Sequence, residues 1–221
     1  MSKDKVAELI MDGAEVAFKQ TLESSLLKDI PIISSIVKIH EIGASIRDQL
    51  YTAKISKFLL CLNEISDTEK ERMLELISHD SKEIEKLSEK IILILESQSD
   101  IEKSDIIANL FLAYIDNEIE SSDFRRALDI TSSIFLDDLK EFLKRDGFHG
   151  FMLQTYEDVD YDGLSGLINT PFIAIDNTPP EELKQDGRGE LVGVTLYKSA
   201  DFGFTYLKAY HYGRRLRHKD G

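Results

Sequence analysis

Apolar residues recur every three or four positions through about the first 145 residues, the spacing of a helix with one buried face. Polar start signals separate these stretches. One is Ser66-Asp-Thr-Glu69, a capping box whose serine and glutamate can satisfy free backbone N–H groups in a first helical turn. The pattern predicts an all-helical region of antiparallel helices joined by short links. The expected helices cover residues 5–28, 31–62, 66–77, 80–95, 105–119 and 122–142.

The residues after Gly147 follow a different pattern, with glycines, aromatics and β-branched runs. Residues 171–175 and 190–197 are expected to form a two-stranded ribbon, with Val192, Val194 and Leu196 on its packed face. The stretch Pro179–Gly189 is expected to be a loop at the tip of the ribbon, projecting into solvent, and a last helix is expected to start at Ser199 or Asp201.

The predicted fold class is mainly α, with an antiparallel multi-helix bundle over residues 1–121. A small α+β module with the ribbon follows over residues 122–221 and is expected to pack on the bundle. Eight apolar residues on the helical stripes are expected to be buried: Ile36, Ile46, Phe58, Leu74, Leu87, Phe111, Phe135 and Phe142.

Two short sequences carry a resemblance to a known fold. Gly166-Leu-Ile168 precedes the first expected strand, and VTLYKSADFG (194–203) leads into the last helix. With them, residues of about 122–212 resemble a winged-helix domain. The resemblance implies a recognition helix in DYDGLSGLI (160–168), which is acidic and has no Arg or Lys to face DNA, so a protein-contact role is expected instead. The whole chain also resembles bacterial helical proteins that have no assigned activity.

The acidic composition narrows the choice of partners. A net charge of −14 argues against general nucleic-acid binding, which needs clustered Lys and Arg. The N-terminal residues lack the apolar core of a signal peptide, so a cytoplasmic location is expected. Residues 26–46 form an apolar helical stretch that could insert into a membrane, but the charges within it favour a buried core helix.

Three aspartates and one cysteine are candidate chemical groups in the sequence. Asp158, Asp160 and Asp162, followed by Gly163, match the first half of a calcium-binding loop, but the bidentate Glu and the exit helix are missing. The alternative is an acidic turn in which Asp160 or Asp162 caps a short helix, so neither a metal nor a cofactor is expected. Cys61 is the single cysteine, which excludes an internal disulfide, and its apolar neighbours predict a buried thiol.

The C-terminal tail holds the one basic cluster of the chain, and it contains the partner-contact candidates Tyr210, Tyr212, Arg214, Arg215 and Arg217. The alternative is a frayed, solvated end. With no convergent catalytic set in the sequence, the expected function is that of a protein-interaction or regulatory protein that binds another protein or its own copy. The other hypotheses are a membrane-acting effector using residues 26–46, a DNA-binding regulator, and an enzyme whose groups converge only in space.

Overall fold

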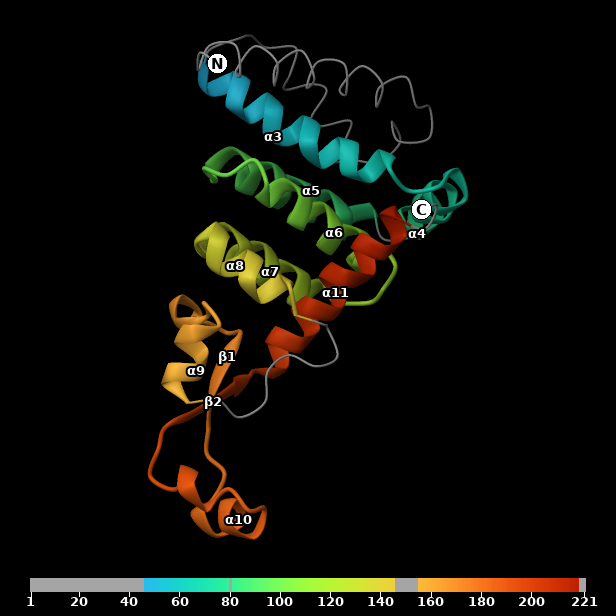
Figure 1. Ribbon diagram of the computed structural model, residues 1–221. Helices are drawn as coiled ribbons and strands as arrows, with labels where there is room; N and C mark the ends of the chain where they lie inside the picture. Colours follow the sequence, from blue (N-terminus) through green and yellow to red (C-terminus); the bar gives the residue numbers. More distant parts are fainter. Residues whose placement is uncertain (1–45, 80, 146–154, 219–221) are drawn as a thin grey trace. The chain divides into compact units, whose positions relative to one another are not determined.

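The computed structural model describes residues 46–79, 81–145 and 155–218 (Figure 1). The predicted helix over 5–28, most of the apolar stretch 26–46, and Ile36 lie outside these residues. The described residues divide into two compact units. Residues up to Ser133, together with those from Tyr212 onward, form the first unit, and Ile134–His211 form the second. The last helix therefore contributes to both units.

The first unit is built around a helix that is almost entirely buried. Its helices are α3 (Ile46–Asn63), α4 (Asp67–His79), α5 (Ser81–Ser97), α6 (Lys103–Ile115) and α7 (Ser121–Ser133). Eleven of the thirteen residues of α6 are buried, and α6 contacts both α3 and α7. Phe111 of α6 lies at its centre, with ring centroids 5.9 Å from Phe58 and 6.2 Å from Phe124. Such contacts dominate the energy of a core because each aromatic ring buries a large area.

The second unit combines short helices with a ribbon. It contains α8 (Leu136–Leu143), α9 (Tyr156–Tyr161), the 3₁₀ turn η2 (Ser165–Leu167), β1 (Ile173–Asp176), α10 (Pro180–Gln185), the 3₁₀ turn η3 (Gly189–Leu191), β2 (Leu196–Ser199) and the start of α11 (Asp201–Arg217). Aromatic rings form its core: Phe172 stacks on Phe142 with 4.5 Å between centroids, and the tilted ring of Tyr206 lies 4.7 Å from Phe172. The two strands are antiparallel, with Ala174 opposite Lys198.

The predicted fold class is confirmed: the described chain is mainly helical, with a small antiparallel two-stranded sheet near its C-terminus. The Ser66 cap is present, because its hydroxyl accepts a hydrogen bond from the Glu69 N–H at 3.3 Å. Phe58, Leu87, Phe111 and Phe142 are buried as predicted. Among the described residues, no helix is both long and apolar enough to cross a membrane.

Two predicted core positions and one predicted helix are wrong. The helix expected over 122–142 is divided into α7 and α8, because Phe135 has an extended backbone (φ −61°, ψ 135°) and stands at the N-cap of α8. The turn directs Phe135 to solvent, where its side chain is 67% exposed. Leu74 is only partly buried. The side chain of Ile46 lies outside the described residues.

The connection between the strands also differs from the prediction. The expected loop Pro179–Gly189 holds α10, because Pro180 suits a first helical turn and Glu181 and Glu182 favour the positive end of the helix dipole. The expected strand over 190–197 is η3 followed by the shorter β2, which leaves Val194 outside the ribbon and 45% exposed. The division of the chain differs from the predicted one as well, since α7 and the end of α11 belong to the first unit.

Candidate functional site

The end of α11 is fixed in the first unit by a buried arginine. The Arg217 side chain is 4% exposed. Its Nε donates to Glu64 Oε2 at 2.7 Å, and its Nη1 donates to Asn109 Oδ1 at 2.9 Å. Its Nη2 lies 2.9 Å from Asp105 Oδ1. Although burial by itself would raise the pKa of Asp105, the bonds from Arg217 hold that pKa below its ordinary value.

Two further residues of α11 support this anchor. Gly213 lies directly against the backbone of α6, where a Cβ would be 2.6 Å from the carbonyl carbon of Asn109. The Tyr212 hydroxyl donates a hydrogen bond to Asp116 Oδ2. The same oxygen accepts a hydrogen bond from Nη2 of Arg72. Burial, reinforced by Asp116, raises the pKa of Tyr212 to about 12.

The five tail residues proposed as partner contacts therefore do not act as one surface. The structure places Arg217 and Tyr212 in internal bonds of the first unit, which corrects the reading of them as contact residues. Tyr210 is half-buried, with its ring edge-on to His211 at 5.2 Å. Arg214 and Arg215 are exposed and remain candidates for contact.

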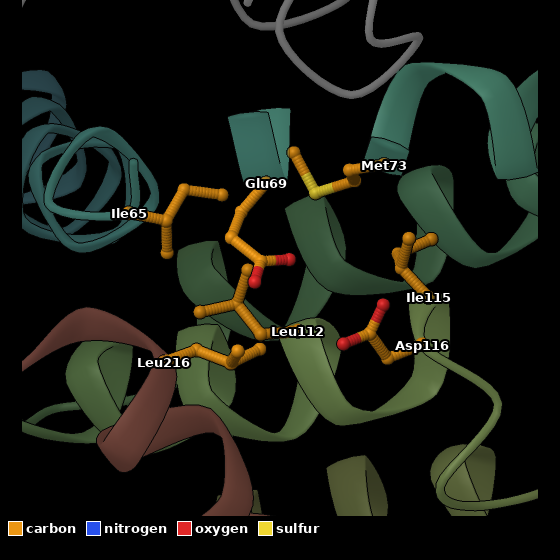
Figure 2. Close-up of a pocket in the computed structure, with 7 residues that line it drawn as sticks. All are labelled: Ile65, Glu69, Met73, Leu112, Ile115, Asp116 and Leu216. Carbon is orange, nitrogen blue, oxygen red and sulfur yellow. The ribbon is translucent and has the colours of Figure 1, made fainter. Parts of the chain in front are cut away.

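A small pocket lies beside this anchor. Figure 2 shows the carboxylates of Glu69 and Asp116 pointing toward its centre, among apolar side chains. The lining residues are Ile65, Glu69, Met73, Leu112, Ile115, Asp116 and Leu216. The space is about that of one water molecule. A pocket of this size is too small for an organic substrate, and both of its carboxylates pair with Arg72.

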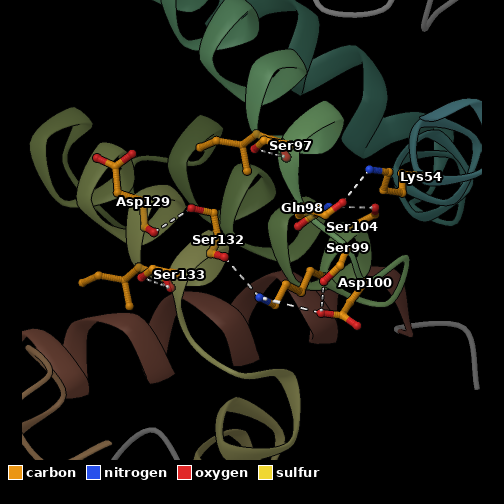
Figure 3. A network of polar contacts seen from close by, with 12 residues as sticks. Lys54, Ser97, Gln98, Ser99, Asp100, Ser104, Asp129, Ser132 and Ser133 are labelled. Atoms are coloured by element: carbon orange, nitrogen blue, oxygen red, sulfur yellow. Dashed lines mark hydrogen bonds and ion pairs between the residues drawn. The ribbon is translucent and has the colours of Figure 1, made fainter. Parts of the chain in front are cut away.

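Two buried lysines serve as helix caps (Figure 3). Lys54 is 4% exposed and its Nζ donates to the carbonyl oxygens of Glu96 and Gln98, at 3.0 and 2.6 Å, at the end of α5. Lys103 donates in the same way to the Ser132 carbonyl at the end of α7, at 3.3 Å. A cation at a helix C-terminus interacts favourably with the helix dipole. Both lysines therefore have structural partners.

Cys61 and the three aspartates have structural surroundings. The Cys61 side chain is fully buried, and its thiol donates to Asp105 Oδ1 at 3.1 Å. Burial, with the negative charge of Asp105, raises the pKa of the thiol, which disfavours the reactive thiolate. Asp158 forms a capping box with Thr155, and Asp162 pairs with Arg145 at 2.6 Å. Thr155 and Asp158 thus cap α9. The expected cap of the short helix at 164–168 by Asp160 or Asp162 is wrong, because that element is η2, whose N-cap is Leu164 and which has no side-chain cap hydrogen bond.

The second unit contains one local structure twice, with an offset of 24 residues. In each copy a helix of six residues is followed by an Asp-Gly pair, a 3₁₀ turn and a strand. We call Thr155–Asp176 the first copy and Pro179–Ser199 the second copy. The glycines that follow the helices, Gly163 and Gly187, both have a positive φ (70° and 74°).

The hydrogen bonds repeat with the same offset. In the first copy, the backbone N–H of Leu164 donates to the Val159 carbonyl at 2.9 Å; in the second, Arg188 donates to Leu183 at 2.7 Å. The hydrogen bonds that close the two 3₁₀ turns also correspond. Each turn is followed by a residue with positive φ, Asn169 in the first copy and Gly193 in the second. In the ribbon, Ala174 lies opposite Lys198, its own equivalent. The two strands therefore pair about a local two-fold axis.

The two copies differ in what surrounds them. In the first copy, Leu164, Leu167 and Phe172 are fully buried, and η2 contacts α8. In the second copy, Leu196 at the position of Phe172 is buried too, but Leu191 at the position of Leu167 is only partly buried. Val194, which stands at the position of the half-buried Thr170, is 45% exposed. A Cβ on Gly187 would meet nothing within 4 Å. The second copy therefore has an open surface where the first copy has a covered one.

We call residues 177–195 the arm. Its first residues are anchored at the ribbon, where Asp176 accepts a hydrogen bond from the Thr178 N–H at 2.7 Å and pairs with Lys198 at 3.0 Å. Burial alone would raise the pKa of Asp176, but these partners hold it below its ordinary value. Residues 179–190 are exposed apart from Leu183 and the half-exposed Arg188. The arm thus presents a helix to solvent from a fixed base.

The sequence analysis missed this duplication, although the sequence contains a signal for it. Asp162-Gly163 and Leu167 recur as Asp186-Gly187 and Leu191, which are few identities in a short stretch. The buried roles of Arg217, Lys54 and Lys103 carried no local signal, since each depends on helix ends that are distant in sequence. Comparison of the chain with protein-family models, with curated proteins and with solved structures gave no match.

Proposed function

We propose that the chain is a protein-interaction protein and that the arm is its main contact surface. The observation that carries the proposal is the difference between the two copies: the same local structure is covered in the first copy and open in the second. Apolar residues that lie together on an exposed surface often mark a site of protein interaction, so an open copy of a structure that is elsewhere covered is a candidate for covering by a partner.

The polar groups of the first unit support this reading. Arg217, Asp105, Lys54 and Lys103 are engaged in ion pairs or in helix capping, and the pocket beside α11 has a volume no larger than about one water molecule. Because these buried groups of the first unit have structural partners, we expect the binding site to lie on the exposed surface of the described residues. The arm carries four acidic residues, Glu181, Glu182, Asp186 and Glu190, against Lys184 and Arg188. The arm is therefore net negative. A negative surface repels the phosphates of duplex DNA, so a protein partner is favoured over DNA.

Site-specific photo-crosslinking tests the proposal. A photoreactive residue at Gln185, which is exposed on α10, is expected to give a discrete crosslinked species in cells of the host. The matched control carries the same residue at Glu85, which is exposed on α5. Mass spectrometry then identifies the partner, and a species of twice the chain mass identifies a second copy. Absence of a species specific to position 185 would refute the proposal.

A further inference from the structure

The first copy shows what kind of element covers this local structure. The helix α8 contacts η2, and its Asp138 lies over Gly166, with its carboxyl carbon 2.8 Å from where a Cβ would stand. The side chain of Glu141 reaches Gly163, 3.4 Å from the equivalent point. Beyond the end of α8, Arg145 pairs with Asp162 at 2.6 Å. The cover is thus an amphipathic helix of about two turns, followed by a cation.

The second copy has the corresponding positions without a cover. Gly187 replaces Gly163 with the same positive φ, and the space around it is open. Asp186 occupies the place of Asp162 and pairs with Arg188 of the same turn, at 2.6 Å. Leu191 stands where Leu167 stands in the first copy, and is less buried than it. The backbone for receiving a helix is therefore present twice.

One sequence difference between the copies indicates which charge a helix bound to the second copy should carry. Glu190 stands at the position of Gly166, the residue against which Asp138 of α8 lies. A helix with an acid at this point would be repelled by Glu190, and the nearby Glu181, Glu182 and Asp186 add to the repulsion. A helix with Lys or Arg there would be attracted, so the second copy discriminates by charge against a helix like α8.

We propose that the second copy binds an amphipathic helix whose polar face is rich in Lys and Arg. The apolar face of that helix would cover Leu191 and Val194, and its cations would meet Glu190 and the acids of α10. This inference rests on the proposed function, because it names the class of partner that the arm contacts. It also explains why the arm keeps apolar residues in a segment that is otherwise exposed and acidic.

The test uses the full chain and three synthetic peptides in a fluorescence anisotropy titration at about 150 mM salt. The first peptide, of about 14 residues so that a helix can form, keeps Leu and Phe at the spacing of Leu136, Leu139, Phe142 and Leu143 and carries Lys or Arg elsewhere. The second has the same apolar positions with Glu in place of the basic residues. The third has the composition of the first in scrambled order, and it controls for general attraction to an acidic protein.

We expect the first peptide to bind, and the other two to bind at least about tenfold more weakly. Two variants of the chain localise the site: Leu191→Ser with Val194→Ser removes the apolar contact, and Glu190→Lys reverses the charge at an exposed position. Each is expected to weaken binding of the first peptide about tenfold or more, whereas Glu85→Lys on α5 leaves it unchanged. Circular dichroism of each variant confirms that the helices are retained.

Equal binding of the scrambled peptide, or binding that neither arm variant weakens, would overturn the inference, as would no binding at all. These failures are distinct from failure of the proposed function. A crosslink at Gln185 together with no binding of the basic peptide would contradict the basic helix as the ligand, while still supporting the arm as a contact surface. The absence of a crosslink removes the proposed function itself.

Discussion

The tight contact between α11 and α6 makes an unusual prediction for Gly213→Ala. In the interior of a helix, this substitution normally stabilises a protein by about 0.5–1 kcal/mol, because Ala has the higher helix propensity. At Gly213, however, the new Cβ would stand 2.6 Å from the Cα and the carbonyl carbon of Asn109. Those atoms belong to the backbone of the most buried helix of the first unit and cannot move aside.

The size of the effect follows from the geometry. Carbon atoms in contact lie about 3.5–4.0 Å apart, so α11 must move away from α6 by roughly 1 Å. Overpacking of this kind costs about 1–3 kcal/mol. The same movement stretches the bond from Arg217 to Asn109, and hydrogen bonds of a charged group contribute about 1.5–3 kcal/mol each. After subtraction of the propensity gain, we expect a net loss of about 2–4 kcal/mol.

Urea unfolding followed by far-UV circular dichroism measures this change. The matched control is Arg214→Ala, at the next position of α11, whose side chain is exposed and whose substitution should change the unfolding free energy by less than about 0.5 kcal/mol. A Gly213→Ala variant as stable as the unmodified chain, or more stable, would show that α11 does not lie against α6 as described.

Three further predictions concern the same anchor. Arg217→Met should lower the unfolding free energy by about 2–4 kcal/mol in urea denaturation, since Glu64 loses its ion pair with Arg217 and Asp105 keeps only the more distant Lys57, at 3.8 Å; a change below about 0.5 kcal/mol would contradict the network. Tyr212 should ionise at about pH 12 in an absorbance titration, together with Tyr51 and later than ordinary tyrosines, and Tyr212→Phe should reduce that late step by the absorbance of one tyrosine. Because the pKa of Tyr212 is raised in the folded chain, the stability it contributes is present below pH 10 and lost between about pH 10 and 12. Cys61 should be unreactive toward an aromatic disulfide reagent at pH 8 until the chain is unfolded, and rapid labelling of the folded chain would show that the thiol is accessible.

Local patterns were sufficient to predict most of the helices. The stripe that contains Phe58 and the one that contains Phe111 are buried, and the Ser66 cap forms where the capping-box sequence places it. These features depend on residues three or four positions apart, which a sequence displays directly. Phe135 was misplaced because it continues the helical spacing of its neighbours, while the break before α8 changes the direction of its side chain.

The candidate site depended on information that local patterns do not contain. Arg217 belongs to a basic tail that resembles a solvated end, yet its partners Glu64 and Asp105 lie more than a hundred positions earlier in the chain. The arm was predicted as a loop because of its prolines, although Pro180 begins a helix. The open surface of the second copy lies in the difference in burial between equivalent residues of the two copies, which a local sequence pattern does not encode.

The duplicated structure has a consequence for how the two copies can change in evolution. Leu164 and Leu167 of the first copy belong to the core, so selection for a folded chain restricts them. The second copy contributes less to that core, so its surface can vary without loss of the fold. In a saturation mutagenesis experiment, substitutions at Leu167 would be removed by a selection for abundance. Substitutions at Leu191 and Glu190 would pass that selection and, under the proposed function, would be removed by a selection for binding. Such a division of constraint lets the first copy maintain the fold while the surface of the second copy varies.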